Sequence, residues 1–136
     1  MSGEDHHWRR IASFLTIADE ERSAANTLIE SNPRQAAFFQ QQSVEKLLRA
    51  VIEFERLNAG PTHNLGELNG ILGRNHAMWQ RFHQFDELSS AAAKFRYPAG
   101  FGGVPSISKD TLRRKQSEIT ALCAEVTEFI GPVKNA

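Results

Sequence analysis

The chain has 136 residues, of which 40% are hydrophobic and 24% are charged, with 16 acidic and 16 basic side chains. This size and composition predict one globular domain over residues 1–136 and exclude a disordered chain. The balanced charge excludes a general electrostatic attraction to nucleic acid or to an anionic membrane. A single cysteine, Cys123, excludes an internal disulfide framework.

The sequence shows no targeting or metal-binding pattern. Residues 1–10, MSGEDHHWRR, lack the apolar run of a signal peptide, and no stretch approaches the roughly 18 apolar residues of a membrane span. We therefore expect a cytoplasmic protein that makes no membrane contact. Histidines, carboxylates and the one cysteine do not recur at metal-ligand spacings, so we expect neither a metal nor another cofactor.

The first predicted helix runs from about Asp5 to Glu30. Between Trp8 and Ile29, apolar side chains recur at steps of three and four residues, which is the period of an amphipathic helix. The sequence SNP, residues 31–33, then ends the helix.

The second predicted helix begins at Pro33 and reaches about Leu57. Asn32 is a candidate N-cap, and proline suits the first helical position because its missing N–H costs little there. The apolar positions of this helix spread over more than half of its circumference, which predicts a central helix that contacts several others. The sequence NAGP, residues 58–61, ends it.

A short third helix and a long fourth helix follow. The sequence THNLGELNGILG, residues 62–73, predicts the short helix, with Thr62 as its N-cap and Gly73 as its C-cap. Apolar residues from Met78 to Phe95 predict the long helix, which ends before Pro98 because the residue preceding a proline leaves helical geometry.

The last predicted helix follows the glycine-rich loop AGFGGVPSIS, residues 99–108. Ser108 is its candidate N-cap, and Pro132 ends it. All of these elements have the helical period, and none has the period of a strand. The sequence therefore predicts an all-α fold, an up-and-down bundle of four long helices plus one short helix.

A polar stripe crosses the apolar second helix. In FFQQQSVEKLLRA, residues 38–50, Gln42, Glu45 and Arg49 are three and four residues apart and share one face, and Lys46 lies one turn after Gln42. If the helix is central, some of these groups are buried, and an unsatisfied buried polar group costs roughly 1–3 kcal/mol. A solvated face with routine ion pairs is one interpretation, and a built polar cluster is the other.

Two chain reversals supply further polar groups, His63 in THNL and the pair Arg96 and Tyr97 in KFRYP. Together with the second helix, these stretches resemble the HEPN domain family (higher eukaryotes and prokaryotes nucleotide-binding). The matching residues are Phe39, Gln41, Gln42, Val44, Glu45, Lys46, Leu48, Ala50, Thr62, His63, Leu65, Arg96, Tyr97 and Pro98. Ser43 stands where alanine is usual in this family, and Arg49 stands where lysine is usual.

The resemblance implies a small helical bundle, often a homodimer, with a role in nucleotide binding. Many members of the family are encoded beside a minimal nucleotidyltransferase in toxin–antitoxin-like pairs, and several branches are ribonucleases. We therefore expect a nucleotide-associated interaction module that forms a homodimer and pairs with such a nucleotidyltransferase.

One hypothesis places the polar stripe and both reversals around a single nucleotide-binding groove. The candidate nucleotide-binding residues are Gln42, Glu45, Lys46, Arg49, His63, Arg96 and Tyr97. The basic side chains would hold phosphate, and Tyr97 would stack on a base. The alternative is a structural network that locks the second helix to the two reversals, which would leave the protein a dimeric scaffold.

An endoribonuclease is the alternative function. The nuclease branches of the family carry an arginine followed within a few residues by a histidine, and Arg56 and His63 match that pattern by count. The sequence LNAGPT lies between them and breaks the helix. We interpret this match as accidental and assign no catalytic residue. A metal-independent endoribonuclease toxin acting on RNA would need two copies of this pair to meet at a dimer interface.

Overall fold

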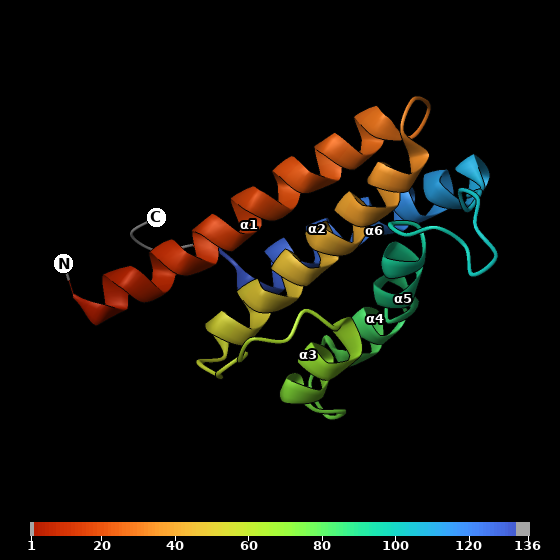
Figure 1. Ribbon diagram of the computed structural model, residues 1–136. Coiled ribbons are helices and arrows are strands. Elements are labelled where there is room, and N and C mark those ends of the chain that lie inside the picture. Colours follow the sequence, from red (N-terminus) through yellow and green to blue (C-terminus); the bar gives the residue numbers. More distant parts are fainter. Residues whose placement is uncertain (1, 133–136) are drawn as a thin grey trace.

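The computed structural model describes residues 2–132, which form six helices and no strand (Figure 1). Three helices are long: α1 (Gly3–Leu28), α2 (Pro33–Phe54) and α6 (Lys109–Ile130). Three are short: α3 (Leu65–Leu72), α4 (Trp79–His83) and α5 (Glu87–Lys94). The predicted all-α fold is confirmed.

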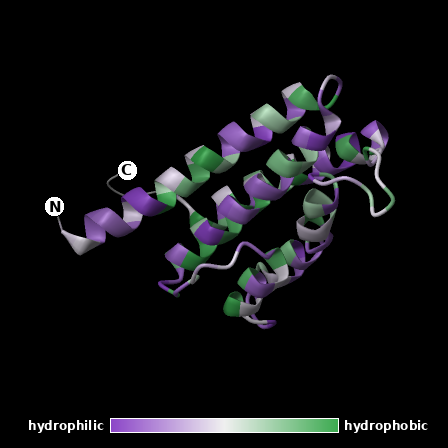
Figure 2. Cartoon of the chain, in the orientation of Figure 1, coloured by the Kyte–Doolittle hydropathy of each residue, from purple (hydrophilic) through white to green (hydrophobic). Residues whose placement is uncertain are grey.

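The α2 helix lies at the centre of the molecule, as its wide apolar surface predicts. It runs antiparallel to α1 along most of its length, and α3, α5 and α6 pack on its other sides (Figure 1). Twelve of its 22 residues are buried, against four of 26 in α1 and six of 22 in α6. The outer helices therefore bury one stripe each, and Figure 2 shows hydrophilic residues alternating with hydrophobic ones along them.

One apolar core joins all of the long helices. Its largest fully buried side chains are Ile11, Leu47, Leu48, Ile52, Leu65, Leu68, Phe82, Phe85, Ile119 and Leu122. Every helix contributes to this core, and α5 contributes Leu88. Within residues 2–132, no helix is both long and apolar enough to span a membrane.

Three of the four predicted helix caps, Asn32, Gly73 and Ser108, occupy the predicted positions, and the fourth is wrong. The Ser108 hydroxyl accepts a hydrogen bond from the amide of Thr111, and Gly73 ends α3 with a φ of 82°. The cap of α3 is Asn64, whose side chain accepts from the amide of Glu67, rather than Thr62. The Thr62 hydroxyl instead accepts from the amide of Asn64 at 3.2 Å, so it supports the cap from one step outside the helix.

The second helix begins as predicted but ends earlier. Asn32 occupies the N-cap position before Pro33, although its side chain makes no capping hydrogen bond. At the other end, the amide of Leu57 donates to the carbonyl of Ile52 at 3.0 Å, and Arg56 adopts a φ of 61°. This is the closing pattern of a Schellman motif, in which the left-handed position is usually a glycine.

The predicted long fourth helix is wrong, because a tight turn at residues 84–86 divides it into α4 and α5. The amide of Phe85 donates to the carbonyl of Phe82 at 2.9 Å, and the amide of Leu88 donates to the carbonyl of Phe85 at 3.0 Å. Three residues per turn place side chains spaced by three on the same side, so all three of these residues reach the core. Over residues 2–132, the bundle therefore has three long and three short helices.

Small side chains allow α1 and α2 to approach closely. Ala18 and Ala25 of α1 have no exposed surface, and neither has Ala36 of α2. Ser43 of α2 is 1% exposed, and its hydroxyl donates to the carbonyl of Ala18 at 2.8 Å. This hydrogen bond satisfies a donor that would otherwise be buried without a partner. Ser43 therefore contributes both a small volume and a link between the two helices.

We expect Ser43→Leu to lower the free energy of unfolding by about 1–3 kcal/mol, because the larger side chain must push α1 away. Ser43→Ala keeps the small volume and should cost only about 1 kcal/mol, the value of one hydrogen bond. Urea unfolding followed by circular dichroism measures both. Ser117→Leu, at an exposed position of α6, is the control, and equal losses from the two leucine variants would contradict close packing at Ser43.

Candidate functional site

The polar stripe of α2 converges on one buried carboxylate, that of Glu45, which is 1% exposed. Its Oε2 atom lies 3.0 Å from Nε of Arg49 and 3.0 Å from Nδ1 of His63. Its Oε1 atom accepts from Nε2 of Gln41 at 3.4 Å. A buried charge is tolerated only when it is paired and hydrogen-bonded, and these three side chains supply that pairing.

Two of these partners also tie α2 to the reversal at residues 60–63. Nη2 of Arg49 donates to the carbonyl of Thr62 at 2.5 Å, and its Nη1 donates to the carbonyl of Gly60 at 3.5 Å. Nε2 of Gln41 also donates to the carbonyl of His63 at 3.2 Å. The arginine fork therefore spans one carboxylate and two carbonyls of its own chain. Arg49 therefore orients the reversal relative to α2, because its N–H groups donate to atoms of its own chain.

The remaining members of the stripe connect α2 to α1. Nζ of Lys46 lies 3.0 Å from Oε1 of Gln42 and 3.1 Å from Oε1 of Glu21 on α1. Gln42 in turn donates to Oε1 of Gln41 at 2.8 Å. Burial raises the pKa of the Glu21 carboxyl above its ordinary value, while the hydrogen bond and charge of Lys46 oppose that rise. Lys46 is thus an interhelical link.

Arg96 and Tyr97 lie at a different level of α2. The guanidinium carbon of Arg96 is 4.8 Å from the centroid of the Phe38 ring and 6.0 Å from that of Tyr97. Phe38 precedes Glu45 by about two helical turns. The contacts therefore divide the seven candidate residues into two groups. The Glu45 cluster contains Gln42, Glu45, Lys46, Arg49 and His63, and Arg96 and Tyr97 form the second group.

A cleft of about 290 Å³ lies beside Arg96 at the N-terminal end of α2. We call it the arginine cleft. Its lining residues are Arg34, Gln35, Phe38, Phe39, Phe95 and Arg96. Nη1 of Arg34 donates to the carbonyl of Phe95 at 3.4 Å, which holds this arginine against the end of α5. The lining contains two arginines, three aromatic rings and no carboxylate.

Arg56 and His63, the pair with nuclease-like spacing, are held by different carboxylates. Nη2 of Arg56 lies 2.6 Å from Oε1 of Glu4 on α1, whereas Nδ1 of His63 lies 3.0 Å from Oε2 of Glu45. Within one chain, these two side chains are thus bonded to separate partners on α1 and α2. Across residues 2–132, no group of three or more His, Cys, Asp or Glu side chains is arranged to hold a metal ion.

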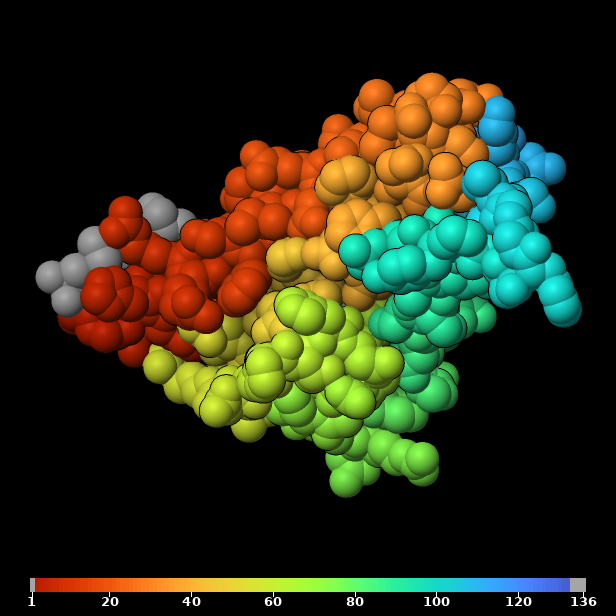
Figure 3. Space-filling view, viewed as in Figure 1, coloured from red at the N-terminus to blue at the C-terminus, as the bar shows by residue number. Residues whose placement is uncertain are grey.

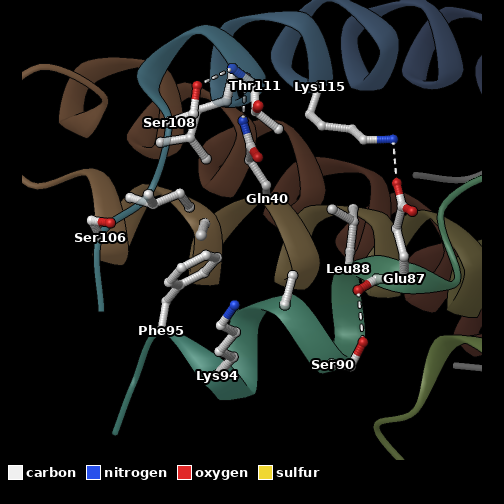
Figure 4. Close-up of a pocket in the computed structure, with 14 residues that line it drawn as sticks. Gln40, Glu87, Leu88, Ser90, Lys94, Phe95, Ser106, Ser108, Thr111 and Lys115 are labelled. Atoms are coloured by element: carbon white, nitrogen blue, oxygen red, sulfur yellow. Dashed lines mark hydrogen bonds and ion pairs between the residues drawn. The ribbon is translucent and has the colours of Figure 1, made fainter. Parts of the chain in front are cut away.

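A second cavity, of about 690 Å³, was not predicted from the sequence (Figure 4). We call it the alanine cavity. It lies between α2, α5, α6 and the segment that precedes α6. Its apolar walls are Ala37, Leu88, Ala91, Phe95, Ile107 and Leu112. Ala37 of α2 and Ala91 of α5 both line this space, so small side chains at these positions of the two helices are the sequence signal that could have found it.

The fold and the cluster define a small all-α domain in which a buried ionic network fixes the central helix to a chain reversal. A family model described as the HEPN domain matches residues 11–136, nearly the whole chain. The chain therefore belongs to the HEPN domain family, which confirms the resemblance found in the sequence. No match is found among curated proteins or among solved structures.

We expect Glu45→Ala to lower the free energy of unfolding by about 3–5 kcal/mol, because it removes the buried carboxylate and leaves the half-buried Arg49 charge without its partner. Glu53, also on α2, is paired with Arg10 near the surface, so Glu53→Ala should cost at most about 1 kcal/mol. Urea unfolding of both variants measures the difference. Similar losses from the two variants would show that the Glu45 cluster is no more important to the fold than a surface ion pair.

Proposed function

We propose that this HEPN domain is a nucleotide-associated interaction module and that its nucleotide contacts come from the arginine cleft. The observation that carries the proposal is the composition of that cleft: two arginines and three aromatic rings with no carboxylate in its lining. Such a lining attracts phosphate and offers flat surfaces to a base. Belonging to the HEPN family supports the same reading.

The geometry of Arg96 suits phosphate recognition. Its guanidinium carbon lies over the Phe38 ring, and a guanidinium attracted to a ring face keeps N–H donors for other partners. An edge with parallel N–H donors binds two phosphate oxygens at once. Arg34, in the same lining, adds a second positive charge. Tyr97 is 62% exposed, so its ring is available to a base.

The Glu45 cluster has a structural part in this proposal. Its donors are engaged with Glu45, with α1 and with the carbonyls of the 60–63 reversal. We therefore assign nucleotide contact to Arg96 and Tyr97 and add Arg34 to them. Gln42, Glu45, Lys46, Arg49 and His63 hold the bundle in shape.

We also propose that the protein acts as a homodimer and pairs with a minimal nucleotidyltransferase in a toxin–antitoxin-like system. Family membership supports this part of the proposal. An interaction module needs apolar side chains that are exposed and so can contact a partner. Tyr97, Phe101 and Val104 are such side chains.

We expect Arg96→Ala to weaken nucleotide binding by about 1.5 kcal/mol or more, the value of a charged hydrogen bond. Isothermal titration calorimetry with AMP, GMP, ADP and ATP, on the wild type and on the variant, measures this change. Tyr97→Ala should weaken binding by about 1–3 kcal/mol through the lost stacking.

Arg74→Ala is the matched control for this experiment. Arg74 is also exposed and also lies over an aromatic ring, with its guanidinium carbon 5.7 Å from the Trp79 centroid, but it does not line the arginine cleft. This change should leave nucleotide affinity unaltered. The proposal fails if the folded wild type gives no heat with any of the four nucleotides, or if Arg74→Ala and Arg96→Ala weaken binding equally.

A further inference from the structure

A fully exposed phenylalanine projects from the segment between α5 and α6. The exposed fraction of Phe101 is 107%, and that of nearby Val104 is 71%. In Figure 3 this part of the chain stands out from the body of the molecule. A large apolar side chain surrounded by water is unfavourable. Tyr97 is also exposed, so three large apolar side chains are exposed within eight residues of the chain, and grouped exposed apolar side chains are a feature of interaction surfaces.

Hydrogen bonds define the turn that carries this ring. The amide of Ala99 donates to the carbonyl of Gly103 at 3.0 Å, and the amide of Gly102 donates to the carbonyl of Ala99 at 2.8 Å. Gly102 and Gly103 both have positive φ, 85° and 86°, a conformation that glycine adopts without strain. The turn therefore holds Phe101 outward in a defined conformation.

The alanine cavity is a complementary hollow on the same chain. Its volume of about 690 Å³ and its apolar walls suit an aromatic side chain. Figure 4 shows Leu88 and Phe95 on one side and the start of α6 on the other. Two lysines also line the cavity: Nζ of Lys94 lies 5.6 Å from the Phe95 centroid, whereas Nζ of Lys115 is paired with the carboxylate of Glu87 at 2.8 Å (Figure 4).

The Lys94 ammonium group favours an aromatic occupant over an aliphatic one. A cation within about 6 Å of a ring face is attracted by the ring quadrupole. Lys94 already lies near Phe95, a ring that borders the cavity, so a further ring entering it would find the same cation. The Phe101 side chain has the required chemistry, whereas an aliphatic side chain would gain only apolar contact.

The ring and the cavity are neighbours in the chain. Phe101 precedes Ile107, a wall residue of the cavity, by six residues. When a projection and a hollow lie side by side on one subunit, a two-fold axis can place the projection of each copy in the hollow of the other. Each copy then contributes the same two elements, as an isologous interface requires.

We propose that two copies of this chain associate with Phe101 of each seated in the alanine cavity of the other. This inference rests on the homodimer proposed above and gives that dimer its interface. The occupant of the cavity is then Phe101 of a second copy of the chain. Occupancy by Phe101 of the same chain, which would leave a single subunit with a closed cavity, is an outcome that the test detects.

Sedimentation equilibrium of the full chain and two variants tests the proposal. The wild type should have twice the 15.3 kDa mass of one chain. Phe101→Ala removes the projection, and Ala91→Phe fills the cavity from α5. Each change should weaken association by about tenfold or more, which corresponds to roughly 1.4 kcal/mol or more. Leu57→Ala is the control, because Leu57 is 40% exposed but lies at the far end of α2.

Mixing the two variants gives the sharper result. Phe101→Ala keeps an open cavity and Ala91→Phe keeps its phenylalanine, so the mixture can form one of the two contacts. We expect a complex of two chains in the mixture at concentrations where each variant alone is a single chain. This recovery also shows that both variants are folded, because an unfolded chain offers neither element.

Three outcomes would overturn the inference. A Phe101→Ala variant that keeps the mass of two chains would reject this interface while leaving the homodimer intact. Two single-chain variants that do not associate when mixed would also reject it. A wild type with the mass of one chain would reject both the interface and the homodimer, whereas nucleotide binding at the arginine cleft is tested separately by calorimetry.

Discussion

The buried carboxyl group of Glu45 is the constraint on which the arrangement of the bundle depends. It lies on the central helix with 1% of its surface exposed, where an unpaired charge would be prohibitively unfavourable. Arg49, His63 and Gln41 surround it. Arg49 and Gln41 also donate to carbonyls of residues 60–63. A single buried charge thus fixes the course of a reversal that has no regular secondary structure of its own.

That fixed reversal sets the position of the next helix. Asn64 caps α3 directly after it, and Leu65 and Leu68 then enter the core with at most 1% of their surface exposed. If the reversal moved, these two leucines would lose their contacts with α2. The polar stripe therefore supports apolar packing. This explains why a helix that fills the core carries so many hydrogen-bonding side chains over three turns.

Much of this fold can be read from the sequence, because helical periodicity is a strong local signal. The central place of α2 follows from its wide apolar surface, and both predicted reversals exist. The break between α4 and α5 could not be read, because Phe82, Phe85 and Leu88 fall on one side at either 3.6 or 3.0 residues per turn. Thr62 and Asn64 are equally good cap residues, and only the backbone geometry decides between them.

The candidate site was harder to predict, because it depends on which part of α2 each reversal meets. His63 follows the end of α2 and returns to its middle, at Glu45. Arg96 comes from the end of α5 and meets α2 two turns earlier, at Phe38. Sequence order places all of these groups near one helix but gives no distance along it. The sequence therefore predicts a single groove, whereas the packing separates the Glu45 cluster from Arg96 and Tyr97.

The segment after α5 links the arginine cleft to the alanine cavity. Phe95 lines both of them, and Arg96, Tyr97 and Phe101 follow it closely in the chain. A ligand that moves the Phe95 ring in the arginine cleft therefore also changes the shape of the alanine cavity. Because coupling between two binding sites is reciprocal, any effect of nucleotide on subunit association must be matched by an equal effect of association on nucleotide affinity. The residue through which such coupling would pass is Phe95, because its ring borders both sites.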